Sequence, residues 1–350
     1  MKRTALMLAL AAMFPAAVFA QSSVKIYGSI DAGVRYQTNV TAAGDGLYSM
    51  ASGNSYANRL GFRGQEDLGD GMNAHFQLES GFNTKTGELD NANNVLFNRT
   101  ASVGIGGKWG SIDLGRQYTI GFRTEKFLDP FDHHYTGIVP LSSGAGTTLP
   151  AAAKTAGLSA SSSSGTRFNN DVHYTGTFGG LIVRAEYALG EVVGDTGKGA
   201  AKAAGFAYTG DTVLAAAAYT RKETPSGFTN QAFIAGGGVK FGAIRAKAGF
   251  SRERQESASA GTYQLETAFG GASYRFTPAL ELTAAVYRSA FDSAASVGSR
   301  TLALAGGTYV FSKNTNLYAE FDLNRYRGAL LPASKQASQR GMSVGILHLF

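Results

Sequence analysis

The 350-residue chain has no cysteine, only seven prolines and a single tryptophan. Without cysteine it can form neither a disulfide framework nor a thiolate metal site, so hydrogen bonding and packing must hold the fold together. Proline cannot donate to a β-ladder, and outside the first 20 residues every proline lies between runs of alternating apolar and polar residues. These prolines are Pro130, Pro140, Pro150, Pro225, Pro278 and Pro332. The pattern indicates a protein built from strands.

Long apolar runs are missing too, except at the very start of the chain. Residues 1–20 carry Lys2 and Arg3, then a short apolar stretch that ends at Ala20, which predicts a signal peptide cleaved after Ala20. A membrane anchor is the alternative, but the stretch is short for a span of about 20 residues. Cleavage removes two positive charges and no acid, so the formal net charge falls from +7 to 7 − 2 = +5. The mature chain, residues 21–350, then has no candidate transmembrane helix, although a closed barrel would let strands cross a membrane.

Residues 96–116 show most clearly what the chain does contain. Ala101, Val103 and Ile105 alternate with small or polar residues up to a glycine-rich turn, and Ile112 and Leu114 continue the alternation beyond it. This period of two predicts a β-hairpin with one apolar face. Comparable runs start at residues 24, 60, 74, 244 and 317.

The connections between these runs are alternately short and long. Short turns are expected near residues 68–71, 106–110, 178–180, 209–211, 241–243, 276–279 and 311–315, and long connections at 38–55, 83–95, 118–165, 191–201, 222–230, 253–261, 292–299 and 328–340. Seven hairpins plus one strand at each terminus predict sixteen strands in one domain. Residues 118–165 have no strand pattern, and an unpatterned segment of this length in a folded chain is usually functional or disordered.

Aromatic residues collect beside the short turns, as they do at a bilayer interface. They are Phe82, Trp109, Phe178, Phe241, Tyr274, Phe276, Tyr309, Phe311 and Phe350. Aromatics are also common strand formers in general, but that preference does not explain their bias to one end of the strands.

Catalytic, metal and nucleic-acid functions find little support. The one Gly-x-Ser-x-Gly match, around Ser343, lies within the terminal strand with no helix after it, which argues against a Ser-His-Asp hydrolase. The glycines at 104–110 have the wrong spacing for a dinucleotide loop, and no cofactor is expected. Calcium could bind Asp129 with Asp132, or Asp90 with Asn91, Asn93 and Asn94, but such loop residues are more often simply solvated. The basic residues are spread over many strands, which argues against nucleic-acid binding.

Several longer motifs stand out, namely residues 24–28 (VKIYG) with 31–34, 59–69 (RLGFRGQEDLG), 76–82 (FQLESGF), 114–118 (LGRQY) and a last strand that ends in Phe350. Together they resemble the Gram-negative general porins, most closely those of beta-proteobacteria, over essentially the whole chain. The resemblance implies a sixteen-stranded antiparallel transmembrane β-barrel, exported through the periplasm to the outer membrane. It also implies a homotrimer whose third long loop, residues 118–165, folds into the lumen and constricts the pore.

The same resemblance implies contacts with outer-membrane lipids and lipopolysaccharide, and a role for Phe350 as a signal to the outer-membrane assembly machinery. The chain departs from the family at two places. Leu347 and Leu349 stand where relatives usually carry basic lumenal residues, and residues 137–140 replace an acidic-aromatic-Gly-Gly loop end.

The function expected from these features is passive diffusion of small ions and hydrophilic solutes. By local motif, Arg59, Arg116 and Arg167 resemble the arginines of a porin constriction, and Asp129 and Asp132 of the inward loop would face them. Arg116 shares the parity of Ile112 and Leu114, so it points inward only if the strand bends or ends there. The other expected pore-lining residues are Lys25, Asp31, Arg35, Arg63, Glu79, Arg184, Glu186, Arg245 and Lys247.

Because basic groups outnumber acids in that set, we expect weak to moderate anion selectivity. An adhesion barrel that binds partners through its outer loops is one alternative. A soluble secreted β-sandwich is another, although it should lack the interface aromatics and the terminal Phe350.

Overall fold

The computed structural model describes residues 23–91, 93–135 and 166–257, together with 261–350. The predicted signal peptide, residues 137–140 and the second half of the predicted constriction loop lie outside these ranges. The strands are β1 (Ser23–Gln37), β2 (Leu47–Ser52), β3 (Arg59–Gly69), β4 (Met72–Gly81), β5 (Thr100–Gly107), β6 (Gly110–Tyr118), β7 (Arg167–Phe178), β8 (Leu181–Ala188), β9 (Ala201–Thr209), β10 (Val213–Glu223), β11 (Thr229–Phe241), β12 (Ile244–Ser257), β13 (Gly261–Arg275), β14 (Leu280–Ser293), β15 (Val297–Ser312), β16 (Thr315–Gly328) and β17 (Ser338–Leu349), and the helix is α2 (Ile120–Leu128).

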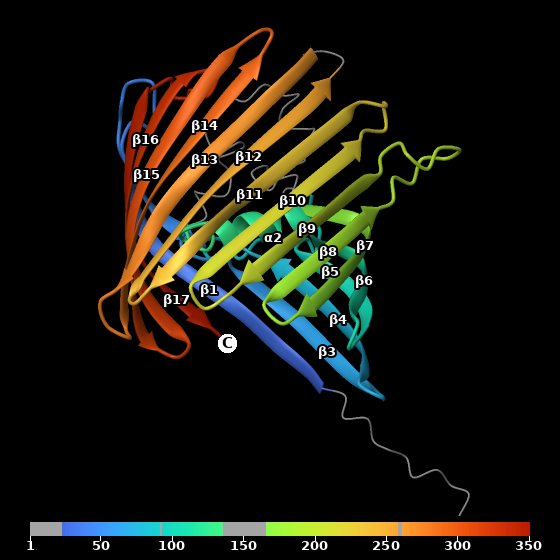
Figure 1. Cartoon of the computed structure of the whole chain (residues 1–350). Coiled ribbons are helices and arrows are strands. Elements are labelled where there is room, and N and C mark those ends of the chain that lie inside the picture. Colours follow the sequence, from blue (N-terminus) through green and yellow to red (C-terminus); the bar gives the residue numbers. More distant parts are fainter. Residues whose placement is uncertain (1–22, 92, 136–165, 258–260) are drawn as a thin grey trace, which may run out of the picture.

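The strands form one antiparallel sheet that closes on itself, because β17 pairs with β1 (Figure 1). Strand β2 is additional to the barrel. The first half of β1 pairs with β3 and its second half pairs with β2, which lies within the first long connection. The remaining sixteen strands confirm the predicted barrel, and closure leaves it without an unpaired edge. Among the described residues, no helix is long and apolar enough to span a membrane.

Alternation along the strands separates an outer apolar face from an inner face. In β17, Met342, Val344 and Ile346 are exposed on the outside, whereas Ser343 and Leu347 are buried on the inside. The aromatics beside the short turns are also exposed, which fits a band at the bilayer interface. Phe82 is the exception, because it follows β4 at the opposite rim and bridges to Leu89 there.

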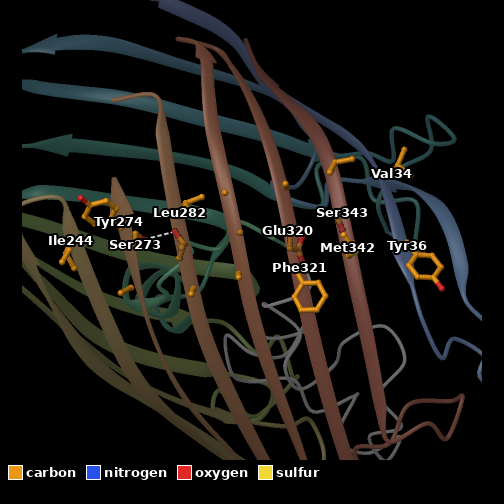
Figure 2. Close-up of a pocket in the computed structure, with 18 of the residues that line it drawn as sticks. Val34, Tyr36, Ile244, Ser273, Tyr274, Leu282, Glu320, Phe321, Met342 and Ser343 are labelled. Carbon is orange, nitrogen blue, oxygen red and sulfur yellow. Dashed lines mark hydrogen bonds between the residues drawn. The ribbon is translucent and has the colours of Figure 1, made fainter. Parts of the chain in front are cut away.

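A mostly apolar groove of about 1000 Å³ crosses the outside of strands β12 to β17 and β1. Figure 2 shows its labelled side chains on these neighbouring strands. One row of register partners explains the hollow, since Gly307 and Ala319 lie between bulkier neighbours. The full row is Ile244, Tyr274, Leu282, Gly307, Ala319, Val344 and Val34.

Helix α2 lies inside the barrel, against the inner faces of β9, β10 and β11 (Figure 1). Its Ile120 and Leu128 are fully buried, and they belong to the same core cluster as small wall residues. A Cβ at Gly205 of β9 would collide with Ile120, so glycine makes room for the helix there. The third long connection therefore folds into the lumen, as predicted, over residues 119–135. The wall residues of this cluster on β9 to β11 are Ala203, Ala207, Leu214, Ala216, Ala218 and Ile234.

Glu125 also lies on the buried side of α2, and one of its carboxylate oxygens has no hydrogen-bond partner within the described part of the chain. Burial raises the pKa of Glu125 to about 8, and the carboxylates of Asp129 and Glu253 act in the same direction. The side chain is therefore mostly protonated at neutral pH.

The first prediction concerns the outer face. Ala248 of β12 is exposed, next to the inward-facing Lys247. Ala248→Leu should fold normally, whereas Ala248→Arg should cost about 2 to 4 kcal/mol near the bilayer midplane. Folding yield into lipid vesicles, scored by the heat-modifiable mobility of the folded barrel, measures the difference. Equal yields for the two variants would show that Ala248 does not face lipid.

The second prediction concerns Glu125. A carboxyl whose pKa is higher in the folded than in the unfolded chain costs stability as the pH rises from about 4.5 through about 8. Glu125→Gln should therefore match the wild-type unfolding midpoint near pH 5 and exceed it by several degrees near pH 9. Heating series at each pH, followed by unheated electrophoresis, give the midpoints. The exposed Glu66→Gln variant is the control, and a Glu125→Gln advantage that does not change with pH would contradict the assignment.

Candidate functional site

Charged wall residues hold both ends of α2. The main-chain N–H of Ile120 donates to both carboxylate oxygens of Glu186 on β8, at 3.1 and 3.3 Å. At the other end, Lys247 Nζ on β12 donates to the carbonyl oxygens of Phe127 and Asp129, at 2.8 and 3.0 Å. An acid at the N-terminus and a base at the C-terminus both match the helix dipole and satisfy backbone groups that the helix leaves unpaired.

After the helix, the chain follows the barrel wall from β12 to β16. Asp129 accepts hydrogen bonds from the Tyr287 hydroxyl at 2.5 Å and from the His133 N–H at 2.7 Å. Asp132 accepts from Lys247 at 2.5 Å and from Arg245 at 2.7 Å. The Tyr135 hydroxyl then donates to the Ala319 carbonyl on β16 at 3.1 Å. The loop is thereby anchored to β12, β14 and β16.

The other side of α2 borders a cavity of about 420 Å³. Strands β3 to β6 provide the facing wall, and one carboxylate, Glu79, lies within that wall. Glu79 accepts from Arg99 Nε at 2.9 Å and from the Tyr27 hydroxyl at 3.0 Å, with Arg59 Nη1 at 3.6 Å. The basic residues that line the cavity are Arg59, Arg99, Arg123, Lys126 and Arg167.

Aromatic rings support several of these cations. The Arg167 guanidinium lies 4.3 Å from the centre of the Tyr118 ring, and Arg59 lies 4.4 Å from that of Tyr56. The Tyr118 hydroxyl accepts from both Arg99 and Arg167, at 2.7 and 2.8 Å. For Arg167 these contacts hold the positive charge against a ring face and a hydroxyl oxygen, whereas Arg59 and Arg99 pair with the Glu79 carboxylate as well.

The cavity is consequently positive. Five of its described lining residues are Lys or Arg, and Glu79 is the one acid among them. His133 adds no charge, because burial lowers its pKa to about 3. The arrangement suits the transient binding of anions.

The three predicted constriction arginines separate in the structure. Arg59 and Arg167 line the cavity, but Arg116 does not. Arg116 lies at a bulge where the β6–β7 register shifts, and it donates to the Asn98 carbonyl at 2.7 Å and to the Asn169 amide oxygen. It lines a neighbouring cavity of about 320 Å³ that Arg167 also borders.

Asp129 and Asp132 were expected to face the arginines, and the structure places both carboxylates elsewhere. Both carboxylates engage the β12 and β14 wall, and neither lines the arginine-rich cavity. The part of the loop that borders that cavity carries Arg123 and Lys126 instead. Among the described residues, the lining of this cavity is therefore basic on both sides rather than acidic on one side and basic on the other.

The other predicted lining residues fall into two groups. Arg35 pairs with Asp322 at 2.7 Å, Arg245 lies 3.6 Å from Glu281 in addition to its bond to Asp132, and Arg184 is partly exposed. Lys25 and Arg63 are exposed register partners, and Arg63 stacks over Tyr27.

Asp31, Glu79, Glu186 and Lys247 are buried instead. Glu79 still borders the cavity, whereas Asp31, Glu186 and Lys247 hold loops and do not face open lumen. Asp31 accepts the main-chain N–H groups of Ser55 and Tyr56, at 2.9 and 2.7 Å, and so fixes the first long loop.

Arg99, Arg123 and Lys126 were missed by sequence reasoning. A signal for the last two was present, since Thr119 is a good N-cap residue and the spacing of Ile120, Arg123, Lys126 and Leu128 fits a short amphipathic helix. No comparable pattern marked Arg99, because this residue lies just before β5 and outside the alternation of that strand.

The remaining motifs have structural explanations. Phe350 exchanges both backbone hydrogen bonds with Gly28, and its ring fills the space that a Cβ at Gly28 would need. Ser343 lies within β17 and accepts from Arg35 at 2.9 Å, so it is not on a nucleophile elbow. Of the suggested calcium ligands, Asp90 accepts from Asn98 and Arg99.

The chain is similar to known proteins over most of its length. The family model for Gram-negative porins matches residues 5–329. An outer-membrane porin of Bordetella pertussis is 40% identical over 144 residues, which cover 37% of this chain and 37% of that protein. Outer membrane porin protein 32 of Delftia acidovorans is 36% identical over 193 residues, covering 55% of this chain and 50% of that protein. The matched stretches thus span half or less of these two relatives.

Solved structures show the same fold over nearly the whole chain. A protein described as an anion-selective porin from Comamonas acidovorans superposes with a TM-score of 0.76 at 23% identity, covering 94% of this chain and 100% of that one. OmpT of Vibrio cholerae gives 0.67 at 16% identity, with 94% and 98% coverage. The chain belongs to the Gram-negative porin family and is a protein of the outer membrane.

Proposed function

We propose that this protein is a channel for passive diffusion of small hydrophilic solutes and ions, with a weak to moderate preference for anions. The observation that carries the proposal is the cavity between α2 and the β3–β6 wall, where five basic residues face a single carboxylate among the described lining residues. Basic residues that line a pore favour anions, and a narrow, partly dehydrated site strengthens their effect.

The comparisons support the same proposal. Family membership favours a channel over an adhesion barrel, and one structural neighbour is described as anion selective. No reaction step is part of the proposal, because solute passes without a change in covalent bonds.

A channel of this kind would have three kinds of partner, namely other copies of the chain, membrane lipids and the assembly machinery. A homotrimer is supported by an OmpT structure described as a trimer form. The apolar outer groove would contact either a neighbouring copy or lipid, and the exposed aromatics would sit among outer-membrane lipids and lipopolysaccharide. Phe350, exposed beside the barrel seam, would be available to the assembly machinery.

The third prediction tests selectivity. Removing two cavity charges together, by Arg59→Gln with Lys126→Gln, should shift the reversal potential in a salt gradient toward that of a cation-preferring pore. Arg116→Gln is the matched control and should leave it unchanged, because Arg116 lies outside the cavity. The shift should shrink at high salt, since the Debye length falls from about 10 Å at 0.1 M to about 3 Å at 1 M.

Planar-bilayer recordings of the folded protein give these values. A wild-type channel that prefers cations, or a double variant indistinguishable from Arg116→Gln, would show that this cavity does not govern ion passage. Failure of the wild type to conduct at all would favour the adhesion alternative.

A further inference from the structure

Three buried side chains of the types that can bind metal ions lie close together near the N-terminal end of α2. Asp171 and His173 are two residues apart on β7 and face inward, and Glu186 is the register partner of His173 on β8. Their exposed fractions are 1%, 2% and 5%. One ligand atom from each residue lies within 4.8 Å of the other two.

The distances suit a shared ion better than direct hydrogen bonds. His173 Nδ1 lies 3.3 Å from Glu186 Oε2 and 3.6 Å from Asp171 Oδ2. Two ligand atoms that are each about 2.1 Å from one tetrahedral ion lie about 3.4 Å apart. A distance of 3.6 Å is too long for a hydrogen bond.

The unsatisfied polar atoms of Asp171 and His173 also favour a shared ion. Within the described residues, neither carboxylate oxygen of Asp171 and neither ring nitrogen of His173 has a hydrogen-bond partner. Buried polar atoms are rarely left unsatisfied, and an uncompensated buried carboxylate is costly. The nearby cation is Arg123 of α2, whose charge acts on both Glu186 and Asp171. With His173 neutral, one positive charge against two carboxylates leaves a deficit that a divalent cation would fill.

We propose that Asp171, His173 and Glu186 bind a first-row divalent transition-metal ion of the Zn²⁺ type, with solvent completing the coordination. One imidazole nitrogen and two carboxylate oxygens are ligands that such ions accept. Since Glu186 also accepts the Ile120 N–H, the ion would stiffen the anchor of α2. The proposal does not rest on the conducting function.

Zinc binding to the chelator-treated, folded protein tests the site. Equilibrium dialysis should find one Zn²⁺ per chain in the wild type. Loss of a partner outside the coordination shell typically weakens metal binding by about 10- to 100-fold, so Asp171→Asn and His173→Gln, which each remove a ligand, should weaken it by about 100-fold or more.

His75→Gln is the matched control. His75 also contacts a carboxylate, Asp113, at 2.7 Å, but its second ring nitrogen is already bonded to Asn73 at 2.9 Å. This variant should bind zinc like the wild type. Equal losses in the His75 and His173 variants would overturn the assignment.

A second readout works even if the substitutions prevent folding. Co²⁺ added to the wild type should give the visible absorption of a four- or five-coordinate site, saturating at one ion per chain and abolished by excess Zn²⁺. Absence of that spectrum together with absence of stoichiometric zinc uptake would overturn the proposal, and would mean that a protonated His173 lies between the two carboxylates instead.

Discussion

The basic cavity inside the barrel depends on how the wall holds a helix of nine residues. So short a helix is not stable alone in water, and its position comes from its surroundings. Glu186 satisfies its first N–H and Lys247 its last carbonyls, while Ile120 and Leu128 pack into a wall of small side chains. With both ends and the apolar side fixed, the side that carries Arg123 and Lys126 can only face the cavity. The positive charge that α2 brings to the cavity therefore follows from contacts made outside the cavity.

The alanines of β10 also help to hold the helix in place. Residues 214–218 have small or apolar side chains at every position, so alternation alone could not tell the inner face from the outer. The structure explains this: Leu214, Ala216 and Ala218 face the lumen but are covered by α2, and so meet no water. The lumenal wall needs polar residues only where it contacts water. Where it packs against the helix, small apolar residues are favoured instead.

This distinction also sets how far the sequence could predict the structure. Lipid imposes one requirement on every strand, so the outer faces and the count of sixteen strands were predictable from alternation. Inner faces have no such common rule. Asp31, Glu186 and Lys247 were expected to line the pore, yet whether such residues contact water or hold a loop depends on where residues distant in sequence dock. Arg116 shows the opposite case, because its parity already argued against the position that motif similarity suggested.

The contacts that Glu186 and Lys247 make with the two ends of α2 also constrain the order of folding. The Ile120 N–H bonds to Glu186, which lies 66 residues later in the chain, and the Phe127 carbonyl bonds to Lys247, which lies 120 residues later. Closing loops of that size is slow and is rewarded only once the distant strand is in place. The first end of the helix can be held only when β8 is in place, and the second only when β12 is in place. The helix therefore takes its final position only when both parts of the wall that receive it have formed.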